Sequence, residues 1–310
     1  MQEFKVFCII VTYNAMKWID KCLTSLMFSN EKPSIVVVDN CSNDLTIPHI
    51  SKKYPDVHLI INQKNKGFGQ ANNQGIEYAY NQGATHFFLL NQDTWIANDT
   101  IKNLILIQDK HEISVVSPIH LNGTGDLLDF SYFMSTVIHE KNREFVSDLI
   151  LGKTRDYYKV YSINAAAWML SRKTVERIGG FDPVFFHYGE DDNYCQRIKY
   201  HNGSVAFIPN SFIHHDRIEH GNMQVFNKNS ITATLLTVYG NINTNFWRID
   251  KKRFLMHMSY CKLALSFLLK LRFKSFVHVI KSYLVFFNKT PVIIRNIKLN
   301  RVEGNNWLDL

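Results

Sequence analysis

Short apolar runs alternate with amphipathic segments between residues 6 and 90, and this alternation constrains the fold more than any other feature of the chain. The runs at residues 6–11, 35–38, 58–61 and 86–90 have the length and composition of buried strands. Segments with helical spacing of apolar residues stand between them, at residues 18–29 and 71–80. Strands and helices that alternate in this way predict an α/β fold with a mostly parallel, doubly wound sheet flanked by helices.

Polar clusters follow the four predicted strands. Their members are Thr12, Tyr13 and Asn14; Asp39 and Asn40; Asn65, Lys66 and Gly67; and Asn91, Gln92 and Asp93. Because open α/β sheets bind ligands outside the carboxyl ends of their strands, we expect these clusters to converge on one edge. Asp93, with Asn91 two residues before it, is a candidate cation site there. The alternative is a simple turn, in which Asp93 and Thr94 cap a helix at residues 96–108.

Two common phosphate-binding motifs are absent from the sequence. The turn after the first strand reads TYNAMKW and contains no glycine, so it is not a dinucleotide fingerprint. GFGQANNQG follows the third strand instead and lacks the spacing of that fingerprint, and no P-loop motif occurs. If phosphates bind to this chain, a metal and side chains must neutralise them.

A second dense cluster lies at residues 178–197, with the sequence IGGFDPVFFHYGEDDNYCQR. Glu190, Asp191 and Asp192 stand together at a predicted helix start. Adjacent carboxylates repel one another and raise their pKa values, so one of them can serve as a general base. The alternative is an acidic first turn that interacts favourably with the helix dipole.

Charge divides the chain into two parts. Residues 251–310 hold twelve Lys and Arg against Glu303 and Asp309, whereas the preceding residues hold 23 basic and 25 acidic side chains. Residues 262–287 carry a polar residue at every fourth position from 262 to 278, and their longest early uncharged stretch, at 263–269, is far shorter than the about 20 residues of a membrane span. A basic helix with a broad apolar face predicts contact with an anionic membrane surface. A helix packed on the remainder of the protein is the alternative, and the apolar excess argues against nucleic acid.

Composition and cysteine usage indicate an intracellular globular protein. The chain is 46% hydrophobic and 20% charged, which excludes a disordered class. Its five cysteines are scattered and form no C-x-x-C pair, so neither a disulfide framework nor a zinc site is predicted. No signal peptide is predicted, because the first apolar run starts after Lys5 and leads into polar residues.

Six motifs resemble those of the family-2 nucleotide-sugar glycosyltransferases, closest to the bacterial rhamnosyltransferase-like and surface-polysaccharide branch. They are VTYN, VVDNCSND, NKGFGQANNQG, LLNQDT, GGFDPVFFHYGEDDNYCQR and IPNSFIHH, and they occur in the family's order between about residues 4 and 216. The resemblance implies a GT-A fold, Mg²⁺ or Mn²⁺ as cofactor, and inversion at the anomeric carbon. We expect a catalytic domain at residues 1–221, with a nucleotide-sugar half to about residue 95 and an acceptor half from residue 96. A basic, amphipathic helical region would follow at residues 222–310.

The resemblance also implies roles for individual residues. Asp191 matches the general base, with Glu190 before it, and Asp93 matches the metal-binding carboxylate. Asn91 replaces the first Asp of the family's D-x-D, and Asn193 replaces the last Asp of its E-D-x-D. His215 fits the late metal or phosphate ligand better than His214. The donor side would consist of Thr12, Tyr13, Asn14, Asp39 (for the pyrimidine), Asn40, Asn65, Lys66, Gly67, Asn91 and Gln92, and the acceptor side of Trp168, Asp192 and Arg197.

Three of these residues have alternative roles outside binding and catalysis: a structural role for His215, core packing for Trp168 and a solvated charge for Lys66. The predicted function is metal-assisted transfer of a hexose or deoxyhexose from a UDP- or dTDP-sugar to a hydroxyl of a lipid-linked or growing surface glycan. The predicted location is the cytoplasm, peripheral on the inner face of the cell membrane and held there by residues 251–310. A nucleotidyltransferase is disfavoured because TYNAMKW lacks a Gly-rich basic loop. A non-catalytic module that binds carbohydrate or membrane is the remaining alternative.

Overall fold

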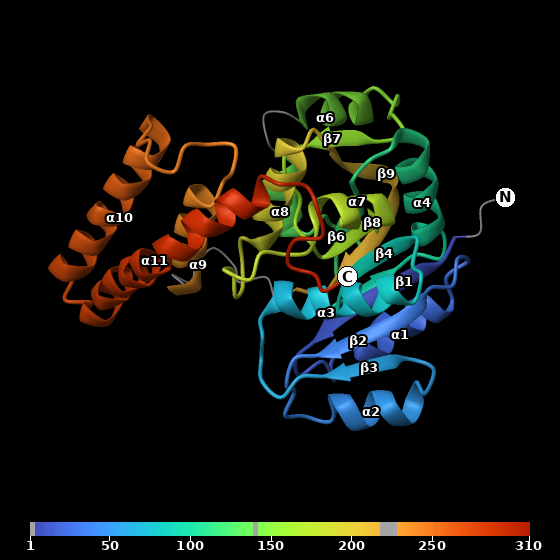
Figure 1. The fold of residues 1–310 in the computed structure, drawn as a ribbon. Coiled ribbons are helices and arrows are strands. Elements are labelled where there is room, and N and C mark those ends of the chain that lie inside the picture. Colours follow the sequence, from blue (N-terminus) through green and yellow to red (C-terminus); the bar gives the residue numbers. More distant parts are fainter. Residues whose placement is uncertain (1–3, 139–141, 218–227) are drawn as a thin grey trace.

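A nine-stranded mixed sheet forms the centre of the protein (Figure 1). The computed structural model describes residues 4–138, 142–217 and 228–310. The strands are β1 (Val6–Thr12), β2 (Ser34–Asp39), β3 (His58–Ile61), β4 (His86–Asn91), β5 (Thr94–Ile96), β6 (Val115–Asn122), β7 (Tyr158–Val160), β8 (Ala167–Ser171) and β9 (Val205–His215). Their order is β3-β2-β1-β4-β8-β6-β9-β5, with β7 paired to β9. Only β5, β7 and β8 run against the other six strands, so the predicted, mostly parallel sheet is confirmed.

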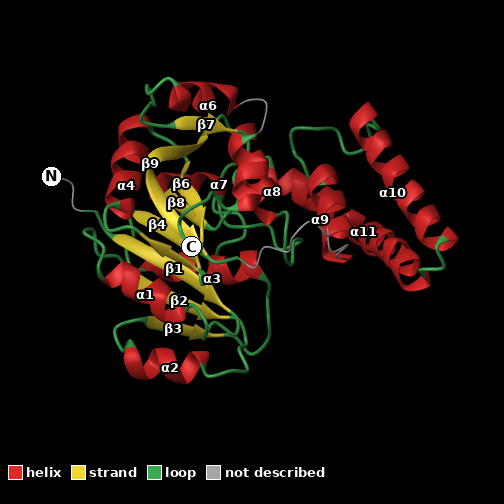
Figure 2. Cartoon of the chain, turned by 180° about the vertical axis from the view of Figure 1, so that it is seen from behind, coloured by secondary structure: helices red, strands yellow, loops and turns green. Residues whose placement is uncertain are grey.

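Helices cover both faces of this sheet (Figure 2). They are α1 (Ile19–Met27), α2 (Thr46–Lys53), α3 (Phe68–Asn81), α4 (Thr100–His111), α5 (Phe130–Tyr132), the π-helical turn η1 (Phe133–Val137), α6 (Arg143–Ile150), α7 (Arg172–Ile178), α8 (Glu190–Tyr200), α9 (Lys228–Tyr239), α10 (Lys251–Leu269) and α11 (Phe273–Asn300). Successive side chains of β1 alternate between the faces. Ile9 packs with α3, α7 and α8 on one face, and Ile10 packs with α1 and α4 on the other.

The strand register aligns the carboxyl ends of the first strands. Thr12 of β1 lies opposite Asp39 of β2, and Val11 lies opposite Asn91 of β4. β9 runs in the same direction, so His215 at its end reaches the same edge. This register brings the polar clusters of the sequence to one edge of the sheet.

Two helices differ from those expected. Residues 94–96 form β5, because Thr94 pairs with His215 of β9, and the next helix starts at Thr100. Asp93 and Thr94 therefore do not cap a helix at residues 96–108. The expected helix at 262–287 is interrupted at residues 270–272, where Leu271 adopts a φ of 54° and α11 turns back against α10. The prediction of a single polar stripe along one continuous helix was therefore wrong.

The C-terminal helices form a unit with its own apolar core. Side chains of α9, α10 and α11 pack together, and they also contact Val184 and Phe185 of the loop between α7 and α8. α10 and the first part of α11 project from the sheet domain, whereas the end of α11 returns to it (Figure 1). Within the described residues, no helix has the length and apolarity needed to cross a membrane. The expected domain boundary at 221/222 lies outside the described residues.

Candidate active site

A cavity of about 370 Å³ opens at the carboxyl ends of β1 and β4. Tyr13, Asn91 and Asp93 line it after β1 and β4, Arg217 lines it after β9, and Tyr188 lines it just before α8. These side chains come from segments far apart in the sequence. The strand register described above is what brings them together, so the predicted convergence of polar clusters at this edge is seen in the structure.

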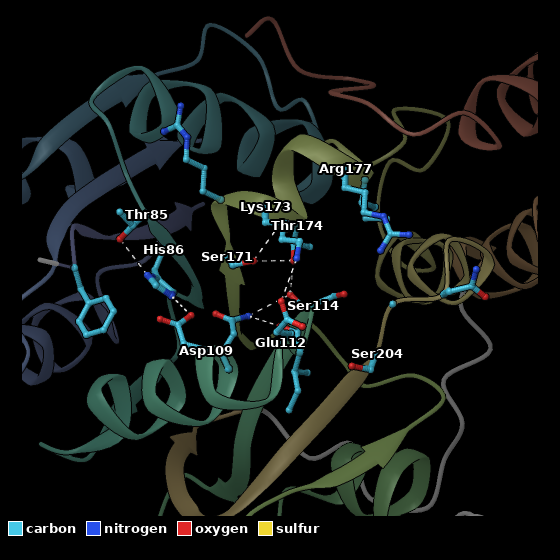
Figure 3. A pocket seen from close by; sticks show the side chains of 17 residues that line it. Thr85, His86, Asp109, Glu112, Ser114, Ser171, Lys173, Thr174, Arg177 and Ser204 are labelled. Atoms are coloured by element: carbon cyan, nitrogen blue, oxygen red, sulfur yellow. Dashed lines mark hydrogen bonds and ion pairs between the residues drawn. The ribbon is translucent and has the colours of Figure 1, made fainter. Parts of the chain in front are cut away.

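A larger cavity, of about 630 Å³, lies at the other edge of the sheet (Figure 3). Two pairs of its side chains contact each other: His86 Nε2 lies 3.0 Å from an oxygen of Asp109, and Lys173 Nζ lies 3.2 Å from an oxygen of Glu112. Because this cavity lies at the amino-terminal ends of β4, β6 and β9, it is remote from the edge where such folds bind ligands. We therefore place the active site in the smaller cavity.

Asp39 is buried at the end of β2 and accepts hydrogen bonds from two neighbours. Thr12 Oγ1 donates to Asp39 Oδ1 at 2.9 Å, Ser42 Oγ donates to the same oxygen at 2.6 Å, and the Ser42 amide donates to Oδ2 at 2.8 Å. These contacts fix the carboxylate at the strand end. Oδ2 keeps acceptor capacity for a further donor, since each carboxylate oxygen has two lone pairs.

Amide side chains hold the loops around the cavity. The Tyr13 amide donates to Gln92 Oε1 at 2.7 Å, and Gln92 Nε2 donates back to the Tyr13 carbonyl at 3.2 Å. Asn40 binds Asn65 in the same way, with its Nδ2 2.9 Å from Asn65 Oδ1, and its Oδ1 accepts from the amide of Lys66 at 2.9 Å. The amide side chains of three predicted donor residues, Gln92, Asn40 and Asn65, thus support the loops at this edge.

The remaining donor residues also lie at this edge. The amide of Asn14 donates to Ser42 Oγ at 2.8 Å, and Asn14 Oδ1 accepts from the amide of Asn43 at 2.9 Å. Lys66 is half-buried and does not line the cavity, so a solvated charge remains an open alternative for it.

Gly67 brings the loop after β3 into contact with the loop between α7 and α8 (residues 179–189, the α7–α8 loop). Its φ is 84°, and an added Cβ would lie 2.0 Å from the carbonyl oxygen of Phe186. The amide of the next residue, Phe68, donates to that same carbonyl at 3.2 Å. Phe186, His187 and Tyr188 line the cavity. Only glycine permits this approach, so the position of the cavity wall depends on Gly67.

Asp93 faces His215 across the β5–β9 pair. Asp93 Oδ1 lies 3.5 Å from His215 Nε2, and Asp129 Oδ2 lies 3.4 Å from the other ring nitrogen. Burial alone would lower the pKa of His215, but the two carboxylates raise it to about 9. His214 points to the opposite side of the strand and stacks on Trp95 at 5.3 Å. The structure therefore brings His215, and not His214, against Asp93.

The donor atoms around Asp93 suit a hard divalent cation. Oδ1 of Asn91 is buried without a hydrogen-bond partner, and neither nitrogen of His215 has a partner of good geometry. Carboxylate, amide oxygen and imidazole are all ligand types for Mn²⁺, and Mg²⁺ favours the oxygens. Within the described residues, however, no group of three His, Cys, Asp or Glu side chains is placed to hold a metal alone. A bound ion would need ligands from substrate or water.

The predicted base lies at the start of α8, three residues after Tyr188. Burial, followed by the charge of Asp192, raises the pKa of Asp191 to about 7. Burial, followed by the charge of Asp191, raises the pKa of Glu190 to about 8, and Oε2 of Glu190 has no hydrogen-bond partner. Asp192 is exposed, and one of its oxygens contacts the hydroxyl of Ser162. Asp191 thus has the proton affinity of a base that works near neutral pH.

Two of the predicted acceptor residues are buried away from the cavity. Trp168 is fully buried and stacks on Phe181 at 6.0 Å. Arg197 is 1% exposed, and its guanidinium donates to the backbone carbonyls of Gly180 and Ile178. An acceptor contact by either side chain would require this core to open, so that assignment has no support in this conformation.

Two residues of the site were not predicted from the sequence. Asp129 contacts His215, but it lies at the N-cap of the short helix α5 and no motif points to it. Arg217 lines the cavity two residues after His215, and no ion pair of its guanidinium is found in the part of the chain that the structure describes. A basic residue so close to a candidate phosphate ligand was the available signal for Arg217.

The mostly parallel sheet, with helices on both faces and polar side chains at its carboxyl edge, has the architecture of a GT-A fold. A sequence profile described as "Glycosyl transferase family 2" matches residues 7–179, and one described as "N-terminal domain of galactosyltransferase" matches residues 150–223. The first match covers more than half of the chain. The protein therefore belongs to glycosyl transferase family 2, and the resemblance seen in its motifs is confirmed.

Named relatives agree with this membership. The chain is 28% identical to dTDP-rhamnosyl transferase RfbF of Shigella flexneri over 207 residues, which are 66% of each chain. It thus spans just under two thirds of that relative. It is 24% identical to Rhamnosyltransferase WbbL of Escherichia coli K12 over 280 residues, 84% of this chain and 99% of the relative. S. aureus TarS 1–349 in complex with UDP-GlcNAc is similar in fold, with a TM-score of 0.56, 16% identity and coverage of 90% of this chain and 79% of TarS 1–349.

Proposed function

We propose that this glycosyltransferase moves a hexose or deoxyhexose from a UDP- or dTDP-sugar to a hydroxyl of a lipid-linked or growing surface glycan, with inversion. The observation that carries the proposal is the cavity at the carboxyl ends of β1 and β4, which Asp93, Arg217 and Tyr188 line. Asp191 follows Tyr188 by three residues, in the first turn of α8. Family membership supports sugar transfer. The dTDP-rhamnosyl and UDP-GlcNAc names of similar proteins support this choice of donors.

The chain's own residues suit a single in-line displacement. The acceptor oxygen would form a bond to the anomeric carbon while the bond from that carbon to the diphosphate oxygen breaks. The acceptor proton would pass to Asp191, whose pKa of about 7 leaves it substantially ionised at neutral pH. Glu190, with its raised pKa, would stay protonated beside it and limit the negative charge near the acceptor.

The donor side must neutralise the diphosphate that leaves. Arg217 lines the cavity with a cationic group, and the buried imidazole of His215 lies 3.5 Å from Asp93 of the same lining. Asp39 would accept a hydrogen bond from the pyrimidine. Asp93, His215 and Asn91 Oδ1 would hold Mg²⁺ or Mn²⁺, which when bound would stabilise charge on the leaving diphosphate. Asp129 fixes the ring of His215 so that Nε2 faces Asp93.

Release of sugar and nucleoside diphosphate from a panel of UDP-, dTDP- and GDP-sugars, with and without Mn²⁺, tests this function. We expect slow hydrolysis of one UDP- or dTDP-sugar, which rises with Mn²⁺ and turns to transfer when an acceptor is added. Asp191→Asn should remove turnover but keep nucleotide binding. The matched control is Asp156→Asn, which replaces an exposed carboxylate distant from Asp191 in the sequence. Failure of every donor to bind would contradict the proposal.

We also propose that the enzyme works on the inner face of the cell membrane, bound to anionic lipid through residues 251–310. The surplus of basic side chains in these residues supports this location. All five cysteines are free thiols, as suits a reducing compartment. A lipid-linked acceptor would then meet the active site at the surface that carries it.

A further inference from the structure

The outer surface of α10 and α11 carries two exposed apolar stripes. On α11 the stripe repeats with alternating steps of four and three residues, which keeps it on one side of the helix. Its members, together called the hairpin face, are Phe254, Met258, Leu265 and Leu268 on α10 and Phe273, Val277, Ile280, Leu284 and Phe287 on α11. Each of these side chains is between 39% and 61% exposed. Apolar surface of this extent marks a contact site.

Both stripes lie on the same side of the helix pair. Inward residues such as Tyr260 on α10 and Tyr283 on α11 contact each other, with ring centroids 6.3 Å apart. A helix with 3.6 residues per turn advances by about 100° per residue. On each helix, the stripe lies about 100° around the helix axis from these inward residues, and it lies in the same direction of rotation when each helix is followed from its N-terminus. The two helices run in opposite directions from the turn at residues 270–272 (Figure 1), so equal rotations place both stripes on one side.

Basic side chains border this face, and they have no acidic partner among the residues that the structure describes. Lys262 on α10 and Lys274 and Lys281 on α11 are exposed beside the stripes, and Lys270 and Arg272 are exposed at the turn. No Asp or Glu occurs between residues 251 and 302. Lysine and arginine can bury their aliphatic stems along an apolar surface while their charges stay at the lipid headgroups. A second copy of this chain would instead bring like charge against like charge.

The turn extends the same chemistry to the tip of the hairpin. Leu269 and Leu271 are 75% and 73% exposed, and they alternate with Lys270 and Arg272. Apolar side chains interleaved with basic ones suit the boundary between acyl chains and anionic headgroups.

We propose that the hairpin face lies in the interface of an anionic phospholipid bilayer, with Leu269 and Leu271 inserted at the tip. The inference rests on the proposed membrane function and adds the surface that performs it. The end of α11 is fixed to the α7–α8 loop, because Asp182 accepts from Asn296 at 2.7 Å and from Asn300 at 2.9 Å. The bound hairpin therefore sets the orientation of the active site relative to the lipid.

Sedimentation with vesicles tests this surface. The full chain would be mixed with vesicles of phosphatidylglycerol and phosphatidylcholine, or of phosphatidylcholine alone. Leu265→Gln/Leu284→Gln should weaken binding to the anionic vesicles at least tenfold, on the order expected when two leucines lose apolar burial. The matched control is Leu106→Gln/Leu149→Gln, two leucines of similar exposure on α4 and α6. Lys262→Gln/Lys281→Gln should reduce the preference for anionic vesicles on the order of tenfold.

The outcomes separate this inference from its rivals. Equal binding of the face variant and its control would overturn the inference, and so would equal binding of the wild type to both kinds of vesicle. Concentration-dependent dimers in ultracentrifugation that the face variant loses, without vesicle binding, would show an interface between copies instead. Nucleotide-sugar hydrolysis is measured on the same samples without lipid. Vesicle binding without hydrolysis of any donor would leave the hairpin inference standing and sink the proposed activity.

Discussion

Replacing Gly67 with alanine tests the contact that holds the cavity wall. Two costs add in this variant. The φ of 84° is unfavourable for an L-residue by about 1 kcal/mol. The new Cβ would meet the Phe186 carbonyl oxygen at 2.0 Å and its carbon at 2.9 Å, so the wall must retreat by more than an ångström. That retreat breaks the hydrogen bond from the Phe68 amide, which contributes about 1 kcal/mol.

A second glycine separates these two costs. Gly83 has nearly the same φ, 81°, but an added Cβ there meets nothing within 4 Å. Gly83→Ala should therefore lower the free energy of unfolding by about 1 kcal/mol, and Gly67→Ala by about 2 kcal/mol. Urea unfolding monitored by fluorescence measures both changes, and calorimetry with UDP and dTDP measures nucleotide affinity.

We expect Gly67→Ala to weaken nucleoside diphosphate binding roughly tenfold, because displaced wall residues no longer fit the ligand. Gly83→Ala should leave that affinity unchanged. If the two variants lose equal stability and bind nucleotide equally well, the Phe186 contact does not hold the wall, and the reasoning fails.

Three further predictions concern charged groups of the site. The pKa of Asp191 is raised to about 7, and only its ionised form accepts a proton. The rate of transfer should therefore rise with pH up to about 7 and then level off. A pH–rate profile at saturating donor measures this. Asp93→Asn should weaken Mn²⁺ binding by the nucleotide complex at least tenfold, whereas Asp126→Asn, an exposed carboxylate in a loop, should not; electron paramagnetic resonance of free Mn²⁺ measures both. Asp129→Asn should weaken the same binding about tenfold while Asp129→Glu restores part of it, since the carboxylate orients His215, and equal affinities of all three proteins would refute that role.

The core of the fold could be predicted because its signals are local. A run such as residues 86–90 is apolar throughout, and a buried parallel strand needs no other information. β5 gave no such signal, because its three residues become a strand only through pairing with the end of β9. The break at residues 270–272 contains neither glycine nor proline. It depends on contacts between α10 and α11, such as the 2.8 Å hydrogen bond between His257 and Tyr283, which the sequence does not display.

The candidate site was predictable only where side chains follow a strand. Asp39, Asn91 and Asp93 each stand at or near a strand end, so a parallel sheet is enough to bring them together. Asp129 reaches His215 only because β6 and β9 pair and the chain then turns into α5. The sequence allows two roles for Trp168 and Arg197, contact with the acceptor or packing in the core. Their burial decided for the core, and burial follows from the packing of α8 on the sheet.

The α7–α8 loop is held from two sides, and this double restraint links the C-terminal helices to the active site. Gly67 permits the contact with Phe186 on one side, and on the other Asp182, only 2% exposed, accepts from Asn296 and Asn300 while Lys289 donates to the Val184 carbonyl at 2.6 Å. Asp182→Ala should cost about 3 kcal/mol, since it leaves buried amide donors without an acceptor. If one loop carries both restraints, either single substitution already frees it. The double variant Gly67→Ala/Asp182→Ala should then lower the free energy of unfolding by about 1 kcal/mol less than the sum of the two single losses. If the losses in free energy measured by urea unfolding are strictly additive, the two contacts act on separate segments. The packing of α11 would then not be coupled to the position of the cavity wall.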